Sequence, residues 1–180
     1  MVDSSRLVLV TGLPGSGKST VAEQVATLIG ASVLGHDWAM SGLRPYDELW
    51  KAMDSMVPPG RGAVGWSICR ALARAQVRRG ASAVLDGVAR PDEVERCRQV
   101  AEEEGCKFVV VLAECADREL HHERIRHRVR SIPGWYELTW DDVERTRTIW
   151  LPPDHVDLTL QATESVEHNG ALIARLLGDT

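Results

Sequence analysis

The stretch RLVLVTGLPGSGKSTVAEQVATLIG, residues 6–30, decides the fold of this chain. It opens with a mostly apolar run that predicts a buried strand over residues 7–11. It closes with apolar residues at helical spacing followed by Gly30, which predicts a helix over residues 19–29. Glycines crowd the segment between the two elements, although glycine weakens both strands and helices. They indicate a ligand that approaches the backbone closely.

Residues 12–19, GLPGSGKS, match the phosphate-loop pattern G-x-x-x-x-G-K-[ST] between the predicted strand and helix. Such a loop turns successive N–H groups toward phosphate oxygens, and the helix N-terminus adds partial positive charge. Lys18 would neutralise the β- and γ-phosphates, and the Ser19 hydroxyl would ligate Mg²⁺. The alternative, a glycine turn with an incidental lysine, fits this context poorly. We predict a nucleoside triphosphate held by Gly12, Pro14, Gly15, Ser16, Gly17, Lys18, Ser19 and Thr20.

Strand and helix signals alternate along the rest of the chain, which is typical of an open α/β sheet. An arginine-rich helix is expected to end near Arg130, and VPPGRG predicts a break in the chain. No repeat and no low-complexity linker occurs, so we predict one domain over residues 1–180. Further strands are predicted over residues 31–34, 82–85, 108–113 and 155–160, and further helices over 45–56, 66–79, 91–105, 141–150 and 165–177.

The composition of the 180-residue chain is that of an ordinary globular protein, with 44% apolar and 26% charged residues. It shows neither a membrane-spanning run nor a signal-peptide pattern, so we expect a cytoplasmic protein without membrane contact. The four cysteines lack metal-ligand spacing and are expected to be reduced thiols. The net charge of −5 disfavours nucleic acid as a partner without excluding a small basic groove. Whether the chain is a monomer or a homodimer stays open.

An arginine-rich segment, CADRELHHERIRHRVRSIPGW, follows the fourth predicted strand. Arg124 and Arg128 are four residues apart, so on a helix they share one face. Guanidinium groups bind phosphate oxygens and stack on an adenine ring. We predict that residues 118–136 form a lid whose Arg124 and Arg128 close over the γ-phosphate and exclude water. The alternative is a solvated basic face paired with Glu119 and Glu123.

The motifs indicate which class of nucleotide-binding protein this chain resembles. The chain contains no N-K-x-D guanine motif, which counts against a GTPase switch, and it is short for a motor ATPase with an added helical domain. GLPGSGKST, GHD, VLDG and HERIRHR follow the first four predicted strands in turn. In this order they resemble small P-loop kinases of adenylate-kinase-like fold, in the branch of polynucleotide 5′-kinases, zeta-type toxins, chloramphenicol phosphotransferase and related antibiotic-modifying enzymes.

The resemblance covers residues 6–150 and implies both a fold and a reaction. It implies a P-loop NTPase fold with a five-stranded parallel sheet of strand order 2-3-1-4-5, helices on both faces and an arginine-rich lid. It also implies transfer of a phosphoryl group from ATP or GTP to an acceptor hydroxyl, with the nucleotide base between the lid and residues 152–155. Such transfer would need Lys18, Arg124 and Arg128 around the phosphates.

Two aspartates follow predicted strands at the sheet edge where open α/β proteins bind ligands. The resemblance implies that Asp37 is the base that takes the hydroxyl proton. Asp37 could instead cap the helix that DWAMSGL begins, and both roles can coexist. We interpret Asp86 as a group near Mg²⁺ or one that orients the acceptor, unless it only forms a turn before Gly87. His36 is expected to be a satisfied loop histidine.

Residues 38–66 are predicted to build the acceptor pocket, because aromatic walls with a few polar groups suit a bulky ring-containing molecule. Trp38 and Arg44 are candidate substrate contacts in this region, and Arg90 is a further one outside it. The alternative is that the tryptophans of this region form core. Three later tryptophans are expected to pack around the lid: Trp135, Trp140 and Trp150.

Three functions fit these observations. The first is a kinase for a hydroxyl of a small molecule, including an antibiotic of nucleoside or sugar type, as in resistance phosphotransferases. The second is a polynucleotide 5′-hydroxyl kinase, and the third is a regulatory module that binds nucleotide without transferring phosphate. The apolar character of residues 38–66 favours the first. A polynucleotide kinase needs a basic track beside Asp37, yet residues 31–61 offer three basic side chains against four acidic ones.

Overall fold

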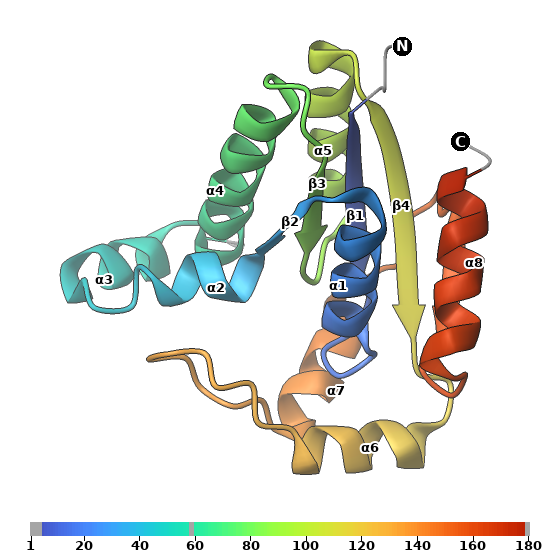
Figure 1. Cartoon of the computed structure of the whole chain (residues 1–180). Coiled ribbons are helices and arrows are strands. Elements are labelled where there is room, and N and C mark those ends of the chain that lie inside the picture. The colour runs from blue at the N-terminus through green and yellow to red at the C-terminus, as the bar shows by residue number, and fades with distance from the viewer. Residues whose placement is uncertain (1–4, 58–59, 179–180) are drawn as a thin grey trace.

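A five-stranded parallel sheet forms the centre of the protein in a computed structural model, which describes residues 5–57 and 60–178. The strand order is β2-β3-β1-β4-β5, as predicted (Figure 1). β1 pairs with both β3 and β4, so the strand that leads into the phosphate loop lies in the middle of the sheet. The strands are β1 (Arg6–Thr11), β2 (Ser32–Gly35), β3 (Ala83–Asp86), β4 (Lys107–Glu114) and β5 (Leu158–Gln161).

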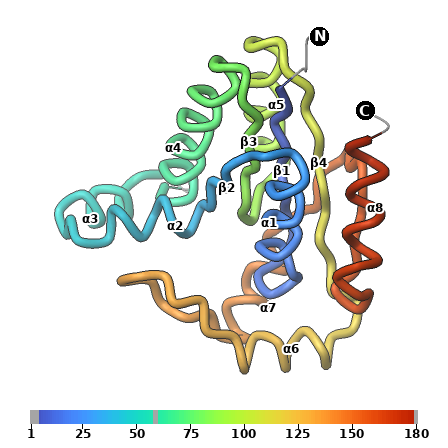
Figure 2. Tube along the Cα trace, viewed as in Figure 1, coloured from blue at the N-terminus to red at the C-terminus, as the bar shows by residue number. Residues whose placement is uncertain are grey.

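Helices cover both faces of this sheet, as Figure 2 shows along the chain trace. α4 and α5 lie on one face, and α1 and α8 lie on the other. In the described chain the helices are α1 (Lys18–Ile29), α2 (His36–Ser41), α3 (Asp47–Ser55), α4 (Gly60–Val77), α5 (Pro91–Glu104), α6 (Arg118–His127), α7 (Trp140–Ile149) and α8 (Val166–Gly178).

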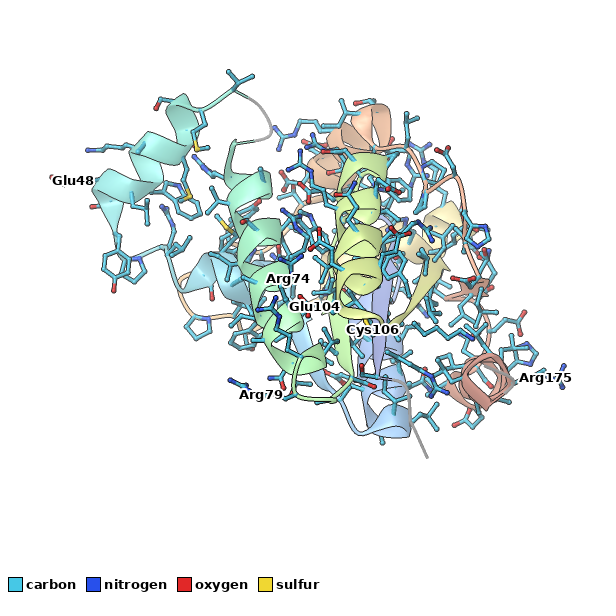
Figure 3. All side chains as sticks on the ribbon, turned by 90° about the horizontal axis from the view of Figure 1, so that it is seen from above. Glu48, Arg74, Arg79, Glu104, Cys106 and Arg175 are labelled. Carbon is cyan, nitrogen blue, oxygen red and sulfur yellow. The ribbon has the colours of Figure 1, made fainter. Side chains whose placement is uncertain are left out.

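The alternation of side chains along β1 produces these two layers, because successive residues of a strand point to opposite faces. Leu7 and Leu9 join the core beneath α4 and α5, whereas Val8 and Val10 join the core beneath α1 and α8. Both faces of the strand are buried, which explains why its sequence is a continuous apolar run. Seen from above, α4 and α5 run side by side, with Arg74 Nε 3.3 Å from Glu104 Oε1 between them (Figure 3).

Several helix boundaries differ from those predicted. α4 begins at Gly60 rather than at residue 66, so part of the VPPGRG break is helical, and residues 58–59 of that break lie outside the described chain. A separate short helix, α2, follows β2 without a loop. α6 ends at His127 because the backbone of Arg128 is extended, with φ −77° and ψ 129°. Residues 128–139 therefore form an irregular segment between α6 and α7.

The carboxyl ends of the strands collect the elements that carry the candidate site residues. The phosphate loop, α6, α7 and the segment between them lie at this end of the sheet (Figure 1). Among the described residues, no helix combines the length and the apolar character that a membrane span requires.

Candidate active site

The phosphate loop joins β1 to α1 through three glycines with positive φ, at 144° for Gly12, 82° for Gly15 and 91° for Gly17. A Cβ atom on Gly12 would lie 2.1 Å from the carbonyl oxygen of Ala113, at the end of β4. Only glycine fits a backbone that turns this way and packs this closely. The loop is therefore built on the central strands of the sheet, as the sequence pattern predicted.

Lys18 is the first residue of α1 and its side chain is buried. Its Nζ donates a 2.9 Å hydrogen bond to the carbonyl oxygen of Leu13, so the side chain folds back across the loop. Burial lowers the pKa of this amine from 10.5 to about 8, although the charge of Asp86 acts in the opposite direction. A buried ammonium group that is held by one neutral carbonyl is well suited to bind an anion.

α6 supports the phosphate loop from the side opposite α1. His121 Nε2 lies 2.6 Å from the carbonyl oxygen of Pro14, and a Cβ atom on Gly15 would lie 2.6 Å from Ile125 Cδ1. Both α6 side chains are buried. The sequence analysis missed His121, because 107 residues separate it from its partner and nothing in the local pattern indicates the contact.

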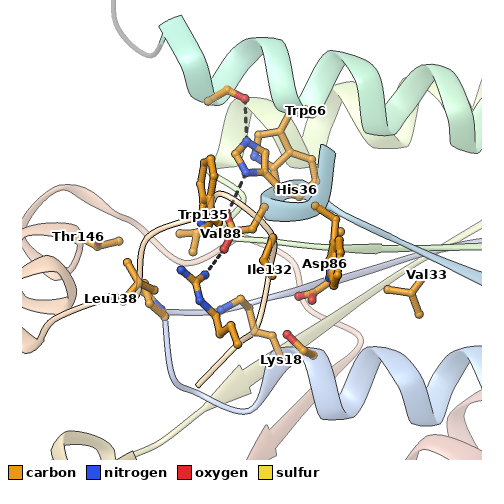
Figure 4. Close-up of a pocket in the computed structure, with 18 of the residues that line it drawn as sticks. Lys18, Val33, His36, Trp66, Asp86, Val88, Ile132, Trp135, Leu138 and Thr146 are labelled. Atoms are coloured by element: carbon orange, nitrogen blue, oxygen red, sulfur yellow. Dashed lines mark hydrogen bonds and ion pairs between the residues drawn. The ribbon is translucent and has the colours of Figure 1, made fainter. Parts of the chain in front are cut away.

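A cavity of about 420 Å³ opens beside the phosphate loop, and we refer to it as the acceptor cavity (Figure 4). Lys18 and Ser19 line it from α1, Asp37 from α2 and Asp86 from β3. The amine, the hydroxyl and both predicted carboxylates thus line the same cavity. Its other walls are mainly apolar and include Val33, Trp38, Trp66, Val88, Ile132, Trp135, Tyr136, Leu138, Ile149 and Trp150.

Asp37 is half-buried in the first turn of α2 and is not the cap of that helix, which is Gly35. Its Oδ1 lies 3.5 Å from His36 Nδ1, and its Oδ2 forms an ion pair with Arg130 Nη1. Burial alone would raise the pKa of Asp37, but the hydrogen bond from His36 and the charge of Arg130 bring it below its usual value. The carboxylate is therefore ionised at neutral pH.

His36 is satisfied, as predicted, although it lies in a helix rather than in a loop. Its Nε2 lies 3.2 Å from the carbonyl oxygen of Gly62 in α4, and its ring centroid lies 5.4 Å from that of Trp66. The histidine therefore fixes the start of α2, and with it the position of Asp37, against α4.

Asp86 ends β3 with one carboxylate oxygen unsatisfied, since its buried Oδ1 has no hydrogen-bond partner in the described chain. Burial raises the pKa of Asp86, while the charge of Lys18 and a hydrogen bond with Ser19 oppose this shift. An orphaned carboxylate oxygen near a hydroxyl is a donor set that fits Mg²⁺, which takes one or two protein oxygens and completes its shell with water and phosphate. Ser19 and Asp86 are the residues that would hold the ion.

A second cavity of about 480 Å³ lies on the other side of the loop. The loop residues from Gly15 to Thr20 line it together with Arg124, Arg128 and residues that follow β5, including Gln161, Ala162 and Asn169. Residues 152–155 line neither of these two cavities. β5 ends at Gln161, and the turn that leads from it into α8 lines the second cavity.

The lid arginines divide between the two cavities. Arg124 Nη2 donates a 2.5 Å hydrogen bond to the carbonyl oxygen of Ala162, which closes one wall of the second cavity. Arg128 lines both cavities, and its contact with the γ-phosphate stays a prediction. The alternative of a solvated face describes part of the helix, because Arg118, Arg124 and Arg126 are exposed and Arg126 pairs with Glu123 at 3.2 Å. Arg130, which was not among the predicted site residues, contacts Asp37.

Comparisons with known proteins agree with this architecture. A family model described as an AAA domain matches residues 7–146, from β1 through most of α7. The chain belongs to this family. It is also 32% identical over 151 residues to a UPF0200 protein from Aeropyrum pernix, a match that covers 80% of this chain and 74% of that protein.

Solved kinase structures share the fold of this AAA domain protein. An APS kinase from Mycobacterium tuberculosis in complex with AMPPNP and APS superposes with a TM-score of 0.67 at 22% identity, covering 97% of this chain and 98% of that one. A sugar kinase from Janibacter superposes with a TM-score of 0.68 at 17% identity, covering 97% and 95%. At these identities the likeness establishes the fold.

The AAA domain brings together most, but not all, of the predicted acceptor residues. Trp38 and Arg90 line the acceptor cavity, whereas Arg44 lines neither cavity. The Arg44 guanidinium lies 4.8 Å from the ring centroid of Trp50, which is buried with Met40 and Met53 in a small separate core. Part of the segment 38–66 is therefore core, which was the alternative to a pocket.

Two of the three tryptophans expected to pack around the lid also line the acceptor cavity. Trp135 reaches it from the irregular segment before α7, and Trp150 reaches it from the end of α7. Trp150 is fixed there by a 2.7 Å hydrogen bond from its Nε1 to the carbonyl oxygen of Ala89. Trp140 does pack on the lid, with its ring 5.3 Å from that of His121.

Proposed function

We propose that this protein transfers the γ-phosphoryl group of ATP or GTP to a hydroxyl group of a small molecule. The observation that carries the proposal is that Lys18 of the phosphate loop and the half-buried carboxylate of Asp37 line one cavity. Phosphoryl transfer requires this pairing, because the transferred group must meet a nucleophile whose proton has a destination. The kinases among the structures of similar fold support the same reaction class.

The phosphate end of the nucleotide would bind where the loop N–H groups, Lys18 and Arg128 converge. Lys18 would exchange the carbonyl of Leu13 for phosphate oxygens, and Arg128 would reach them from the lid. The base would occupy the second cavity, near Arg124. Mg²⁺, held by Ser19 and Asp86, would supply positive charge to the phosphate oxygens.

In the chemical step the acceptor oxygen forms a bond to the γ-phosphorus while the bond to the β–γ bridging oxygen breaks. The hydroxyl proton passes to Asp37, and the leaving nucleoside diphosphate carries away the electron pair of the broken bond. Lys18 and Arg128 stabilise the charge that develops on the transferred group. The walls of the acceptor cavity exclude water, which would otherwise compete with the acceptor.

The lining of the acceptor cavity favours an acceptor with a ring. Trp38 and Tyr136 line it while remaining 58% and 57% exposed, so they flank an opening rather than fill a core. Aromatic walls with a few charged groups suit a flat or bulky molecule of nucleoside, sugar or antibiotic type. A cavity of about 420 Å³ matches a small molecule.

The proposal is tested with γ-labelled ATP and GTP and three acceptor pools: hydroxylated antibiotics, nucleosides with sugars, and 5′-hydroxyl oligonucleotides. We expect labelled product from one of the first two pools. Transfer to oligonucleotides instead would establish a polynucleotide kinase. Nucleotide binding without transfer to any pool would favour a regulatory module.

A further inference from the structure

Arg130 lies in the irregular segment between α6 and α7 with its side chain only 6% exposed. Its Nη1 pairs with Asp37 Oδ2, and its Nη2 donates a 2.6 Å hydrogen bond to the carbonyl oxygen of Tyr136. Its Nε is buried without a hydrogen-bond partner in the described chain, and Glu137 Oε2 lies 3.6 Å away. The guanidinium group therefore holds the candidate base while one of its own donors stays unsatisfied.

This arrangement weakens Asp37 as a base, because Arg130 occupies part of the carboxylate and its charge lowers the pKa of Asp37. An acceptor hydroxyl needs a carboxylate oxygen that is free to take its proton. In the structure Oδ2 is engaged by Arg130, and Oδ1 faces His36 at 3.5 Å. Movement of Arg130 away from Asp37 would free Oδ2 for the hydroxyl and restore the basicity of the carboxylate.

A polyphosphate in the loop offers Arg130 a better set of partners. Arg130 lines the same cavity as Lys18 and Arg128, so phosphate oxygens held by these two groups come within the space that Arg130 already faces. Guanidinium groups bind phosphate through two parallel hydrogen bonds, and such binding would also satisfy the orphaned Nε. Asp37 offers a single carboxylate oxygen and repels phosphate itself.

The backbone beside Arg130 is held in an unfavourable conformation. Ser131 has φ 52° and is the one non-glycine residue with positive φ in the described chain. Non-glycine residues stay in this region only where their surroundings hold them there. The N–H of Arg130 donates a 3.0 Å hydrogen bond to Glu137 Oε1, so the segment is tied to itself as well as to Asp37. Release of the ion pair would remove one of the contacts that maintain this strain.

We propose that Arg130 is a positioning residue that sets the order of substrate binding. In the structure Arg130 is paired with Asp37. The γ-phosphate draws Arg130 away, and this exchange frees Asp37 to hold the acceptor hydroxyl. The inference rests on the proposed function, because it requires a polyphosphate in the loop.

The test is a double-mutant cycle on the dissociation constant of Mg²⁺-AMPPNP, measured by isothermal titration calorimetry without acceptor. The proteins are the wild type, Asp37→Asn, Arg130→Ala and the double variant. We expect Asp37→Asn to tighten binding about 10-fold in the wild-type background, since it frees Arg130 for the phosphate. In the Arg130→Ala background the same change should have less than about a 3-fold effect.

The cycle separates this mechanism from simple repulsion between Asp37 and phosphate. Repulsion alone predicts an equal or larger gain when Arg130 is absent, and that result would overturn the inference. A wild-type protein that fails to bind AMPPNP would overturn the proposed function as well. Arg126→Ala is the matched control, because Arg126 lies on α6, lines neither cavity and should leave the affinity unchanged. Should Arg130→Ala fail to fold, Arg130→Gln takes its place in the cycle.

Discussion

His121 Nε2 lies 2.6 Å from the carbonyl oxygen of Pro14, and this contact fixes α6 to the phosphate loop. Arg147 Nη2 approaches the other ring nitrogen, Nδ1, at 3.4 Å. Because arginine can only donate, Nδ1 is the acceptor and the proton resides on Nε2, which donates to Pro14. Burial lowers the pKa of His121, so the neutral tautomer that this geometry requires is present at neutral pH.

Loss of this contact should weaken nucleotide binding. His121→Ala leaves a buried carbonyl without its donor and removes the support of the loop, so we expect the dissociation constant for AMPPNP to rise about 10-fold. The neighbouring His122 is exposed and packs on Trp140, which makes His122→Ala the control. Equal affinities for the two variants would show that α6 does not position the loop.

Lys18 should lower the stability of the folded protein, although nucleotide binding requires this residue. Its folded-state pKa of about 8 lies below the usual 10.5, so keeping the buried amine charged at pH 7 costs folding free energy. We expect Lys18→Met to abolish nucleotide binding and to stabilise the protein by about 1–2 kcal/mol. This gain is smaller than the free energy that corresponds to the whole pKa shift, because the variant also removes the attraction between Lys18 and the Asp86 carboxylate. Urea unfolding at pH 7 measures the change. A destabilised Lys18→Met protein would contradict this account.

The affinity for ADP should fall as the pH rises through the pKa of Lys18. Below about pH 8 the amine is protonated and binds phosphate directly, whereas above it binding must first recharge the amine. The charged side chains that surround it are Asp37, Asp86, Arg128 and Arg130. We therefore expect the dissociation constant to be constant near pH 7 and to rise about 10-fold per pH unit above 8.

Calorimetry in two buffers of different ionisation enthalpy measures the accompanying proton uptake. ADP is used with excess EDTA, because its terminal phosphate is fully ionised above pH 8 and no metal ion then competes for the charge. An affinity that stays constant to pH 9.5 without proton uptake would show that Lys18 is not the group that binds phosphate.

Gly12 and Gly30 provide a matched pair of glycines with positive φ. A Cβ at Gly12 would lie 2.1 Å from the backbone oxygen of Ala113, whereas nothing lies within 4 Å of a Cβ at Gly30. Gly12→Ala must displace the loop or the end of β4, so we expect a loss of about 3 kcal/mol or more, whereas Gly30→Ala should cost about 1 kcal/mol. Urea unfolding of both variants tests this. Equal costs would show that the tight turn is not required.

The fold and the phosphate loop were predictable because their signals are local. Buried parallel strands appear as short apolar runs, and the loop requires glycine where φ is positive and lysine where the helix begins. The positions of Asp37 and Asp86 followed from one further rule, that parallel strands meet at their carboxyl ends. These predictions needed no knowledge of distant contacts.

The walls of the acceptor cavity were harder to predict, because an aromatic residue in a sequence does not reveal which side of a core it faces. Arg44 lies on Trp50 outside the cavity, whereas Trp150 lines it from a helix more than 100 residues beyond Asp37. Arg130 was missed as a partner of Asp37 because α6 ends three residues before it. Helical spacing therefore could not indicate its direction.

The most direct test of the central claim is single-turnover transfer from γ-labelled ATP to a hydroxyl acceptor, comparing the wild type with Asp37→Asn. Asparagine keeps the shape of the side chain but cannot take the hydroxyl proton. We expect the variant to bind nucleotide at least as tightly as the wild type and to transfer the label about 10²–10⁴-fold more slowly. A variant that transfers label at the wild-type rate would show that Asp37 is not the base and would contradict the account.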